Sequence, residues 1–288
     1  MNNYKPNIDI LFINTIEIQG GAARAAYRIF NGIKKFSNNI LYLTLFKESE
    51  DREICGLNEK SIRGKIASFM IRFEYYPLKF YTLKEHITFT PSFISNPFQI
   101  PIRNFKPKIV HLHWLGFSYL RIEKLTQLSC PIVWTLHDQW AFTGGCHYSG
   151  DCKRYENQCG QCPQLNSLKK FDITYKLIER KKKTFKKLNL TIVTPSQWLA
   201  NLAHKSTLLK DIPIHVIPNG LDTQVFKPID HKAAKEYYNF SEKLPVLLFS
   251  AASLIDPRKG SDLLIQALKN LDFPFILLSF GIGELKLS

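Results

Sequence analysis

The sequence lacks the features that mark membrane-spanning, secreted and disordered chains. None of its uncharged apolar runs reaches the roughly 18 residues that a transmembrane helix needs. The opening residues, MNNYKPNIDILFIN, contain no basic region, apolar core or cleavage site, so we expect no secretory signal. Low-complexity segments and internal repeats are missing too. With 45% hydrophobic and 22% charged residues over 288 positions, the composition indicates one large globular domain, or one domain and part of another.

The charge is strongly one-sided. Lys and Arg number 39 against 24 Asp and Glu, which gives a net charge of +15. Such a surplus favours anionic partners: nucleic acid, an acidic bilayer or a phosphate-bearing ligand. Nucleic acid is the least favoured, because no aromatic stacking platform or known reading motif accompanies the charge. Six cysteines without a secretory signal indicate reduced thiols or metal ligands more than disulfides.

Short apolar runs alternate with helical stretches along most of the chain. This rhythm predicts an α/β fold with a parallel sheet covered by helices on both faces. The rhythm pauses between about residues 50 and 106, where we expect an irregular insertion of helix and loop. Ser196 and Ser261 are the expected N-caps of helices that begin at Gln197 and Asp262. The expected strands are 8–13, 40–46, 109–113, 132–136, 190–194, 214–218, 244–250 and 273–280.

Four cysteines gather in a loop at 141–165, with the spacing C-x5-C-x6-C-x2-C. They are Cys146, Cys152, Cys159 and Cys162. Four thiolates would fill the tetrahedral sphere of zinc, so such a site would be structural, with His147 able to replace one cysteine. The alternatives are four unlinked thiols, or two disulfides in an oxidising compartment.

Two loops could hold phosphate. Gly20-Gly21 lies between an expected strand and helix, where free amides at a helix start can bind an anion. A tight turn without a ligand explains this pair equally well, because the pattern is neither GxGxxG nor a Walker loop. Arg258 and Lys259, again before a helix, could clamp a pyrophosphate or form a solvated basic loop.

His137-Asp138 follows an expected strand, where side chains of open α/β sheets face the ligand cleft. An imidazole or carboxylate there could bind a sugar hydroxyl or assist proton movement, although the pair could also simply cap the loop. His111 and His113 share one face of a strand. We expect packing for His111 and regard His113 as a weaker site candidate.

The segment 169–187 carries nine cations and two anions. Phe171, Tyr175, Ile178 and Phe185 fall on one helical face, so the segment could rest on an anionic membrane surface. A solvated face on an ordinary domain helix is the alternative. We expect a cytoplasmic protein, with peripheral binding to the inner face of the plasma membrane as an option.

Several blocks in this order resemble family-4 glycosyltransferases of the GT-B fold, close to the branch that builds exopolysaccharides and lipopolysaccharides. They are QGGAARAAYR, VHLHWLG, PIVWTLHDQWAFTGGCHYSGDC, CGQCPQL, TIVTPSQWLA, VIPNGLDTQVFKP and DPRKGSDLL. The resemblance implies two Rossmann-like domains. A nucleotide-diphosphate sugar binds mainly to the second domain and the saccharide or lipid-linked acceptor to the first, and the sugar is transferred with retention and without a catalytic metal.

By position, Gly20 and Gly21 resemble the loop near the donor diphosphate. His137 resembles the histidine near the transferred sugar, and Lys259 the lysine that neutralises the diphosphate. Many relatives carry an arginine where this chain has Ser253. The resemblance also implies an E-x7-E segment beyond Ser288, so we expect a truncated chain: an acceptor domain over 1–218 and an incomplete donor domain over 219–288. A non-catalytic remnant that binds an acceptor or a membrane is the competing interpretation.

Overall fold

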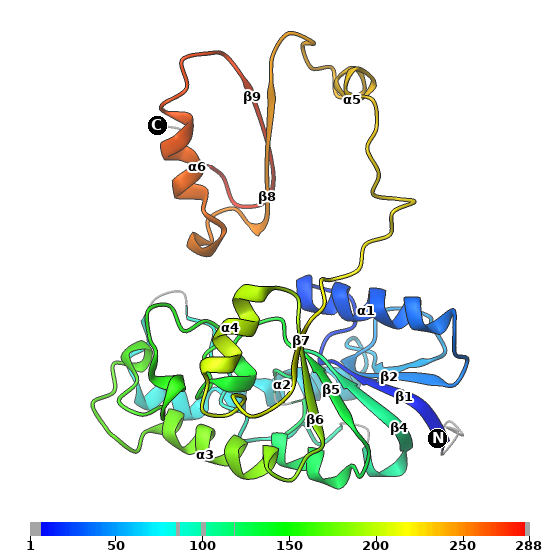
Figure 1. Cartoon of the computed structure of the whole chain (residues 1–288), viewed down its shortest axis with the longest axis vertical. Coiled ribbons are helices and arrows are strands. Elements are labelled where there is room, and N and C mark those ends of the chain that lie inside the picture. The colour runs from blue at the N-terminus through cyan, green and yellow to red at the C-terminus, as the bar shows by residue number, and fades with distance from the viewer. Residues whose placement is uncertain (1–6, 85–86, 99–101, 118, 286–288) are drawn as a thin grey trace. The chain divides into compact units, whose positions relative to one another are not determined.

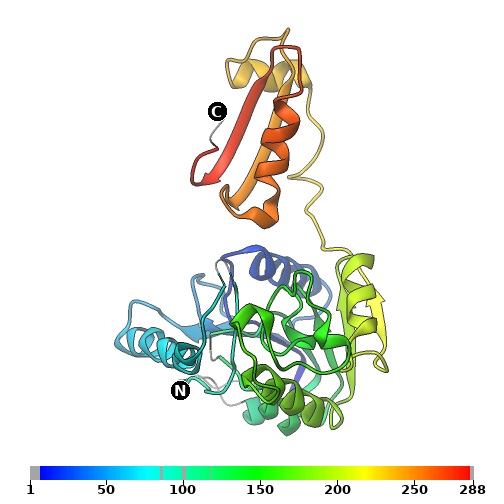
Figure 2. The same ribbon diagram turned by 90° about the vertical axis from the view of Figure 1, so that its left-hand side faces the viewer.

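The computed structural model describes residues 7–84, 87–98, 102–117 and 119–285. The chain divides into two compact units, residues 1–220 and 221–288, and each unit is described by itself. Figures 1 and 2 show both units in two orientations. No helix among these described residues is long and apolar enough to span a bilayer.

The first unit is built on a parallel sheet of seven strands in the order β3-β2-β1-β4-β5-β6-β7. The strands are β1 (Asn7–Ile13), β2 (Ile40–Phe46), β3 (Ile54–Leu57), β4 (Lys106–Leu112), β5 (Ile132–Thr135), β6 (Leu190–Thr194) and β7 (Ile214–Val216). Both faces of the interior strand β1 are buried, because Leu11 and Ile13 join one apolar core cluster while Phe12 joins another. Burial on both faces explains why such strands are near-continuous apolar runs. The predicted α/β class with a parallel sheet is confirmed.

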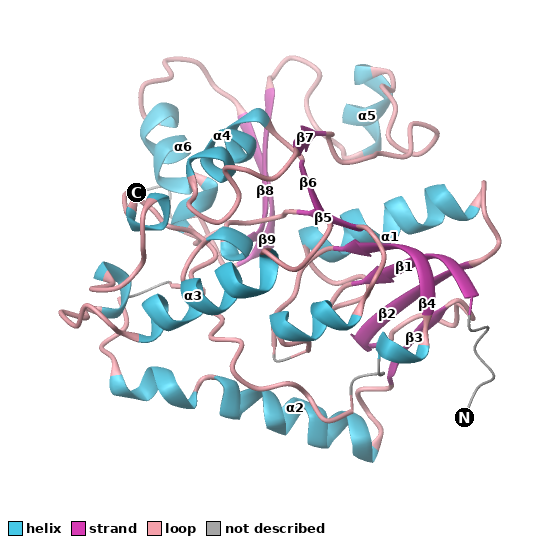
Figure 3. Cartoon of the chain, turned by 60° about the horizontal axis from the view of Figure 1, so that its bottom comes forward, coloured by secondary structure: helices cyan, strands magenta, loops and turns pink. Residues whose placement is uncertain are grey.

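Helices cover the two faces of this sheet. They are α1 (Gly21–Lys34), α2 (Ile62–Glu74), α3 (Ile173–Phe185) and α4 (Gln197–Lys205). On one face Phe30 of α1 packs against Phe12 and Tyr42. On the other, Phe185 of α3 lies edge-on to Trp134 of β5 at a centroid distance of 5.9 Å. Figure 3 shows the helices around the strands.

The second unit contains one parallel strand pair, β8 (Val246–Ser253) and β9 (Ile276–Ile282). Its helices are α5 (His231–Tyr237) and α6 (Ser261–Leu268). The expected cap at Ser261 is wrong, because α6 begins at that residue and Gly260 precedes it as the cap with a φ of +77°. The cap at Ser196 is confirmed, since its hydroxyl accepts a hydrogen bond from Leu199 N at 3.3 Å.

The expected insertion between residues 50 and 106 is more ordered than predicted. It holds the short edge strand β3, the 13-residue helix α2 and a 3-10 turn at Tyr76–Phe80. Ser61 caps α2, with its hydroxyl accepting from Gly64 N at 3.1 Å. The strand escaped prediction because ICGL is only four residues long and carries a glycine and a cysteine in place of a β-branched run.

Candidate active site

The strand order reverses between β1 and β4, so these neighbours mark the switch point of the sheet. In open α/β sheets, ligands bind beyond the carboxyl ends of the strands at this point. The residues that follow β1 are Asn14 and Thr15, and those that follow β4 are His113 and Trp114. Chain direction alone therefore brings two polar loops to the same edge.

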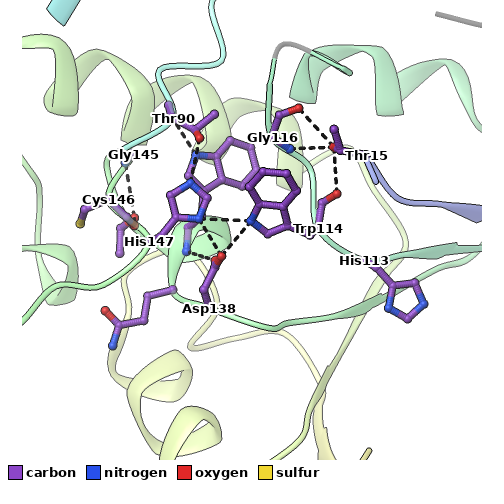
Figure 4. Close-up of polar contacts among 12 residues, drawn as sticks. Thr15, Thr90, His113, Trp114, Gly116, Asp138, Gly145, Cys146 and His147 are labelled. Carbon is purple, nitrogen blue, oxygen red and sulfur yellow. Dashed lines mark hydrogen bonds and ion pairs between the residues drawn. The ribbon is translucent and has the colours of Figure 1, made fainter. Parts of the chain in front are cut away.

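Hydrogen bonds fasten these two loops to each other (Figure 4). Thr15 N donates to Trp114 O at 2.9 Å, and Trp114 N donates to the Asn14 side-chain oxygen at 2.8 Å. Thr15 Oγ1 in turn accepts from Gly116 N at 2.9 Å. Asn14 and Thr15 are fully buried. The backbone at the switch point is therefore held by internal hydrogen bonds. We refer to these bonds between residues 14–15 and 114–116 as the clamp.

Three histidines meet next to this clamp. His113 Nδ1 lies 3.0 Å from His137 Nε2, and the rings of His111 and His113 are 4.3 Å apart between centroids. His111 Nε2 also contacts Thr135 Oγ1 at 2.8 Å. Burial lowers the pKa of His137 to about 4, against the opposing charge of Asp138. Burial, and then the neighbouring His137, lower the pKa of His111 to about 4, and burial lowers the pKa of His113 as well. At neutral pH the group is uncharged and serves as hydrogen-bonding imidazoles.

Asp138 organises the other side of the site (Figure 4). Its Oδ2 lies 2.6 Å from His147 Nδ1 and accepts from Trp114 Nε1 at 3.0 Å, while Oδ1 accepts from Trp140 N at 2.8 Å. Both carboxylate oxygens are thus engaged by protein groups. His113, Trp114, His137, Asp138 and Trp140 line one small cavity. The two predicted residues His137 and Asp138 both line this cavity, and Asp138 is placed to orient its neighbours.

The loop after β1 leads to the predicted phosphate glycines. Gly20 has a φ of +89°, which an L side chain rarely adopts, and it precedes α1 without a side-chain cap or an acidic residue in the first turn. The first amides of a helix have no intrahelical partner, so this end presents donors. No atom outside the neighbouring residues lies within 4 Å of a Cβ placed at Gly20 or Gly21. The glycine loop is exposed and unobstructed.

Arg258 and Lys259 belong to the second unit, before α6. The Arg258 guanidinium is already paired with Asp256 at 2.6 Å, and this contact lowers the pKa of that carboxyl. Lys259 is exposed. Of the two predicted cations, Lys259 is the better placed to meet a ligand, while Arg258 is held by its own loop.

Comparison with known proteins decides the family. The model of Glycosyltransferase Family 4 matches residues 19–225, which include the glycine loop, the histidine cluster and the cysteines. The chain belongs to glycosyltransferase family 4.

Individual relatives are more distant. The chain is 28% identical over 130 residues to the putative colanic acid biosynthesis glycosyl transferase WcaC of Escherichia coli (strain K12), a match that covers 40% of this chain and 32% of that protein. A crystal structure of a glycosyltransferase from Rickettsia africae is similar with a TM-score of 0.51 at 15% identity, covering 96% of this chain and 61% of that one. Medicago truncatula UGT71G1, crystallised with UDP-glucose, gives a TM-score of 0.43 at 12% identity, with 96% and 67% covered. The chain therefore spans less than two thirds of the E. coli and Rickettsia relatives, and the fold it shares with the latter agrees with the predicted GT-B class.

The four loop cysteines of this family-4 chain line one cavity, beside Thr143 and Tyr155. All of them are free thiols. Within the described parts of the chain, however, no three His, Cys, Asp or Glu side chains are grouped so as to hold a metal ion. The predicted zinc site is therefore not confirmed. The suggestion that His147 replaces a cysteine is wrong, because its Nε2 contacts Thr90 Oγ1 at 2.8 Å and its Nδ1 contacts Asp138.

The basic segment 169–187 does not present all of the apolar face on which its predicted membrane role depends. Ile178 and Phe185, two of the four residues of its expected apolar face, are buried in the protein core. Asp172 caps α3, and its outward lysines form a solvated face, which was the alternative. One cation of the run is not solvated at all. Lys181 is buried, its ammonium donates to the carbonyls of Trp140 and Thr143, and burial lowers its pKa to about 7.

Sequence reasoning missed Asn14, Thr15, Trp114 and Thr90 as parts of the site. Asn14 and Thr15 could have been suspected, because polar residues directly after a buried strand face the ligand edge of a parallel sheet. Thr90 carried no comparable signal. It lies in the insertion, and only the folded chain brings it to His147.

Proposed function

We propose that this chain serves a glycosyltransferase that moves a sugar from a nucleotide-diphosphate sugar to a saccharide or lipid-linked acceptor in cell-surface polysaccharide synthesis, with retention of configuration. The observation that carries the proposal is the position of the histidine cluster. It lies at the switch point of a sheet in a family-4 chain, at the same edge as an uncapped helix start. The named biosynthetic role of the E. coli relative supports the substrate class.

The reaction needs groups that stabilise negative charge on the leaving diphosphate. Cleaving the bond between sugar and phosphate develops positive charge on the sugar and extra negative charge on the leaving diphosphate. In the first unit, amide donors at Gly20 and Gly21 are suited to stabilise that charge. For Lys259, in the second unit, the same role rests on its match to the family's diphosphate-binding lysine. Arg258 is exposed and keeps N–H donors beyond the two that Asp256 engages, so it could add to this stabilisation while its ion pair stays formed.

His137 would act as a neutral hydrogen-bonding group. Its lowered pKa keeps the imidazole uncharged at neutral pH, so that it can contact a sugar hydroxyl without repelling positive charge on the sugar. Asp138 would hold Trp114 and His147 beside it and act as a positioning residue. No catalytic metal enters this scheme.

A panel of nucleotide-diphosphate sugars, with release of the nucleoside diphosphate as the readout, tests these roles on the full chain. We expect turnover to fall at least about tenfold in His137→Ala and Lys259→Ala, as loss of a group acting on developing charge predicts. His204→Ala and Lys269→Ala, at exposed positions, are the matched controls. Unchanged turnover in the first pair would reject the assigned roles. Acceptor binding without turnover of any donor would favour the non-catalytic module.

The cysteine loop is our candidate for a structural metal site. Support comes from Cys146, Cys152, Cys159 and Cys162, which line one cavity without being grouped as metal ligands in the described residues. Soft thiolates prefer zinc, whose binding would fix the loop that carries His147. Elemental analysis of the purified chain should find about one zinc per chain, lost when the four cysteines are changed to serine. If the purified chain contains no metal, is fully reduced and is as stable as the four-serine variant, the cysteines are four unlinked thiols instead.

A further inference from the structure

The helix α2 and the turn that follows it carry a stripe of exposed apolar side chains. Its members recur at steps of three and four residues and are each at least 44% exposed. They are Ile62, Ile66, Phe69, Phe73, Tyr76, Phe80 and Leu83. Figure 3 shows α2 at the periphery of the first unit. We refer to these seven side chains as the α2 stripe. Monomeric soluble proteins rarely expose so much contiguous apolar surface without a binding role.

The opposite face of α2 fastens the helix to the protein. Ala67 is fully buried, and its carbonyl accepts from Asn96 Nδ2 at 3.3 Å. Gly64 lies so close to the 58–59 backbone that an added Cβ would come within 2.2 Å of Asn58 O. The stripe is therefore the outward face of an anchored helix. Its rings also contact one another, with 5.3 Å between the centroids of Phe69 and Phe73.

Cations border the stripe, and the nearest exposed acid before it in the sequence is Glu59. Helical spacing places Lys65 and Arg72 along one side of the stripe and Arg63 along the other. Lys60, Lys79 and Lys84 add exposed positive charge at both ends. The single acidic residue from 60 to 84 is Glu74, which is buried and accepts from Ser92 N at 2.8 Å. An exposed apolar face bordered by cations fits the boundary between acyl chains and anionic headgroups.

We propose that the α2 stripe is a docking surface for an anionic lipid bilayer. Phenylalanine and isoleucine side chains would enter the acyl boundary, while the lysines and arginines would contact phosphate headgroups. A second copy of the chain is a poorer occupant, because it would bring six further cations against these six, with Glu59 the one exposed acid beside them. The proposal stands independently of the transferase chemistry, since binding to lipid requires no donor.

Cosedimentation of the full chain with lipid vesicles tests whether the α2 stripe binds a bilayer. We use phosphatidylcholine alone and phosphatidylcholine with about 30% phosphatidylglycerol, because surface potential grows with the share of anionic lipid. The parent should bind the anionic vesicles and bind less as salt is raised. The Phe69→Ser/Phe73→Ser variant should bind at least about tenfold more weakly, because two apolar anchors are lost. Lys65→Glu/Arg72→Glu should lose the preference for anionic lipid.

The matched control lies on the rival basic segment. Phe171→Ser combined with Lys182→Glu and Lys183→Glu changes exposed residues around α3 and should leave vesicle binding unchanged. Circular dichroism and thermal unfolding verify that each variant folds, which exposed substitutions should permit. Three results would overturn the proposal: failure of the parent to bind anionic vesicles, loss of binding in the α3 variant alone, or a change of oligomeric state in Phe69→Ser/Phe73→Ser with binding intact.

Discussion

Burial decides the charge state of the histidine cluster. His111 and His137 are half-buried and packed among neighbours that remove much of their hydration, so protonating either costs more than in solution. Each imidazole is therefore a neutral donor and acceptor, fixed by a partner at 2.8 to 3.0 Å. This uncharged state suits groups that face a sugar on which positive charge develops.

The lowered pKa values predict how stability depends on pH. Below about pH 6.5 the unfolded chain binds protons that the native cluster does not bind, so the free energy of unfolding falls as the pH drops towards 4. Above pH 6.5 these groups do not make the free energy of unfolding depend on pH. Each histidine should contribute about 1.4 kcal/mol per pH unit within this window.

Denaturant unfolding between pH 5.5 and 7.5 measures this slope. His111→Gln removes one of three titrating groups while its amide can still reach the Thr135 hydroxyl, so the slope should fall by about a third of the cluster's share. The exposed His204→Gln is the control and should retain the parent slope. An unchanged slope in His111→Gln would show that the buried imidazole is not the group that resists protonation.

The hydrogen bonds that Asp138 accepts can be tested by an isosteric substitution. Asp138→Asn keeps the shape but removes the charge that His147 Nδ1 and Trp114 Nε1 contact. We expect a loss of about 1–3 kcal/mol in the free energy of unfolding, typical of a buried hydrogen bond to a charged group. The exposed Asp151→Asn should change it by less than about 0.5 kcal/mol. Equal effects of the two substitutions would contradict the organising role of Asp138.

Individual residues were predictable where position on a strand carried the information. His137 and Asp138 stood out because they follow an apolar run, and both line the small cavity beyond β5, while their roles stay predictions. Lys181 shows the limit. It sits in a run of cations that looked uniformly solvated, and its burial under the Trp140 ring follows from packing that no local pattern encodes.

Among the described helices, α3 has the N-terminus whose capping side chain accepts the most hydrogen bonds. Asp172 Oδ1 accepts from Thr174 N at 2.9 Å and from Tyr175 N at 3.2 Å, while Oδ2 accepts from Cys162 N at 2.9 Å. One buried carboxylate therefore caps the helix and ties the cysteine loop to it.

Asp172→Ala should lower the free energy of unfolding by about 2–3 kcal/mol, because a cap and a buried acceptor are lost together. Ser196→Ala removes the exposed cap of α4 and should cost about 1 kcal/mol. Chemical denaturation of both variants gives the comparison. A smaller loss in Asp172→Ala than in Ser196→Ala would contradict this account.

The start of α1 allows a cleaner pair of substitutions. Gly20→Ala forces a side chain into a φ of +89° and should destabilise the chain by about 1–2 kcal/mol. Gly21→Ala meets no atom within 4 Å and should leave stability unchanged or slightly raised. If a diphosphate approaches these amides, Gly21→Ala should still weaken donor binding in titration calorimetry. Full donor affinity in this variant would place the donor elsewhere.

The strands were the most predictable elements. Fully buried parallel strands need apolar residues on both faces, so runs such as ILYLTLF are recognisable without any knowledge of the fold. The α2 stripe was not predicted, because its spacing equals that of an ordinary helix packed on a core. Only the structure shows which of the helix's faces is free.

At the scale of the whole molecule, the connection between the two units is the most accessible part. Residues 215–233 are all exposed, and residues 217–222 form no regular element. Limited digestion with thermolysin should therefore cut first between about residues 217 and 229, while the core of the first unit resists, as expected for an exposed linker. Lys227 precedes Pro228, so trypsin should cut there poorly. Early cuts within β1 or β4 would contradict the division into units.

The clamp at the switch point also bears on how such sequences can diverge. Residues 14–15 and 113–116 lie about a hundred positions apart along the chain and are bonded directly to each other. Between Leu57 and Lys106 the chain leaves the sheet and returns to it, and the residues described there contribute no strand. The strand order does not depend on this segment, although Thr90 within it contacts His147 and accepts a hydrogen bond from Trp140 Nε1. The α2 stripe lies within this segment and the histidine cluster lies outside it, so substitutions can change either one separately.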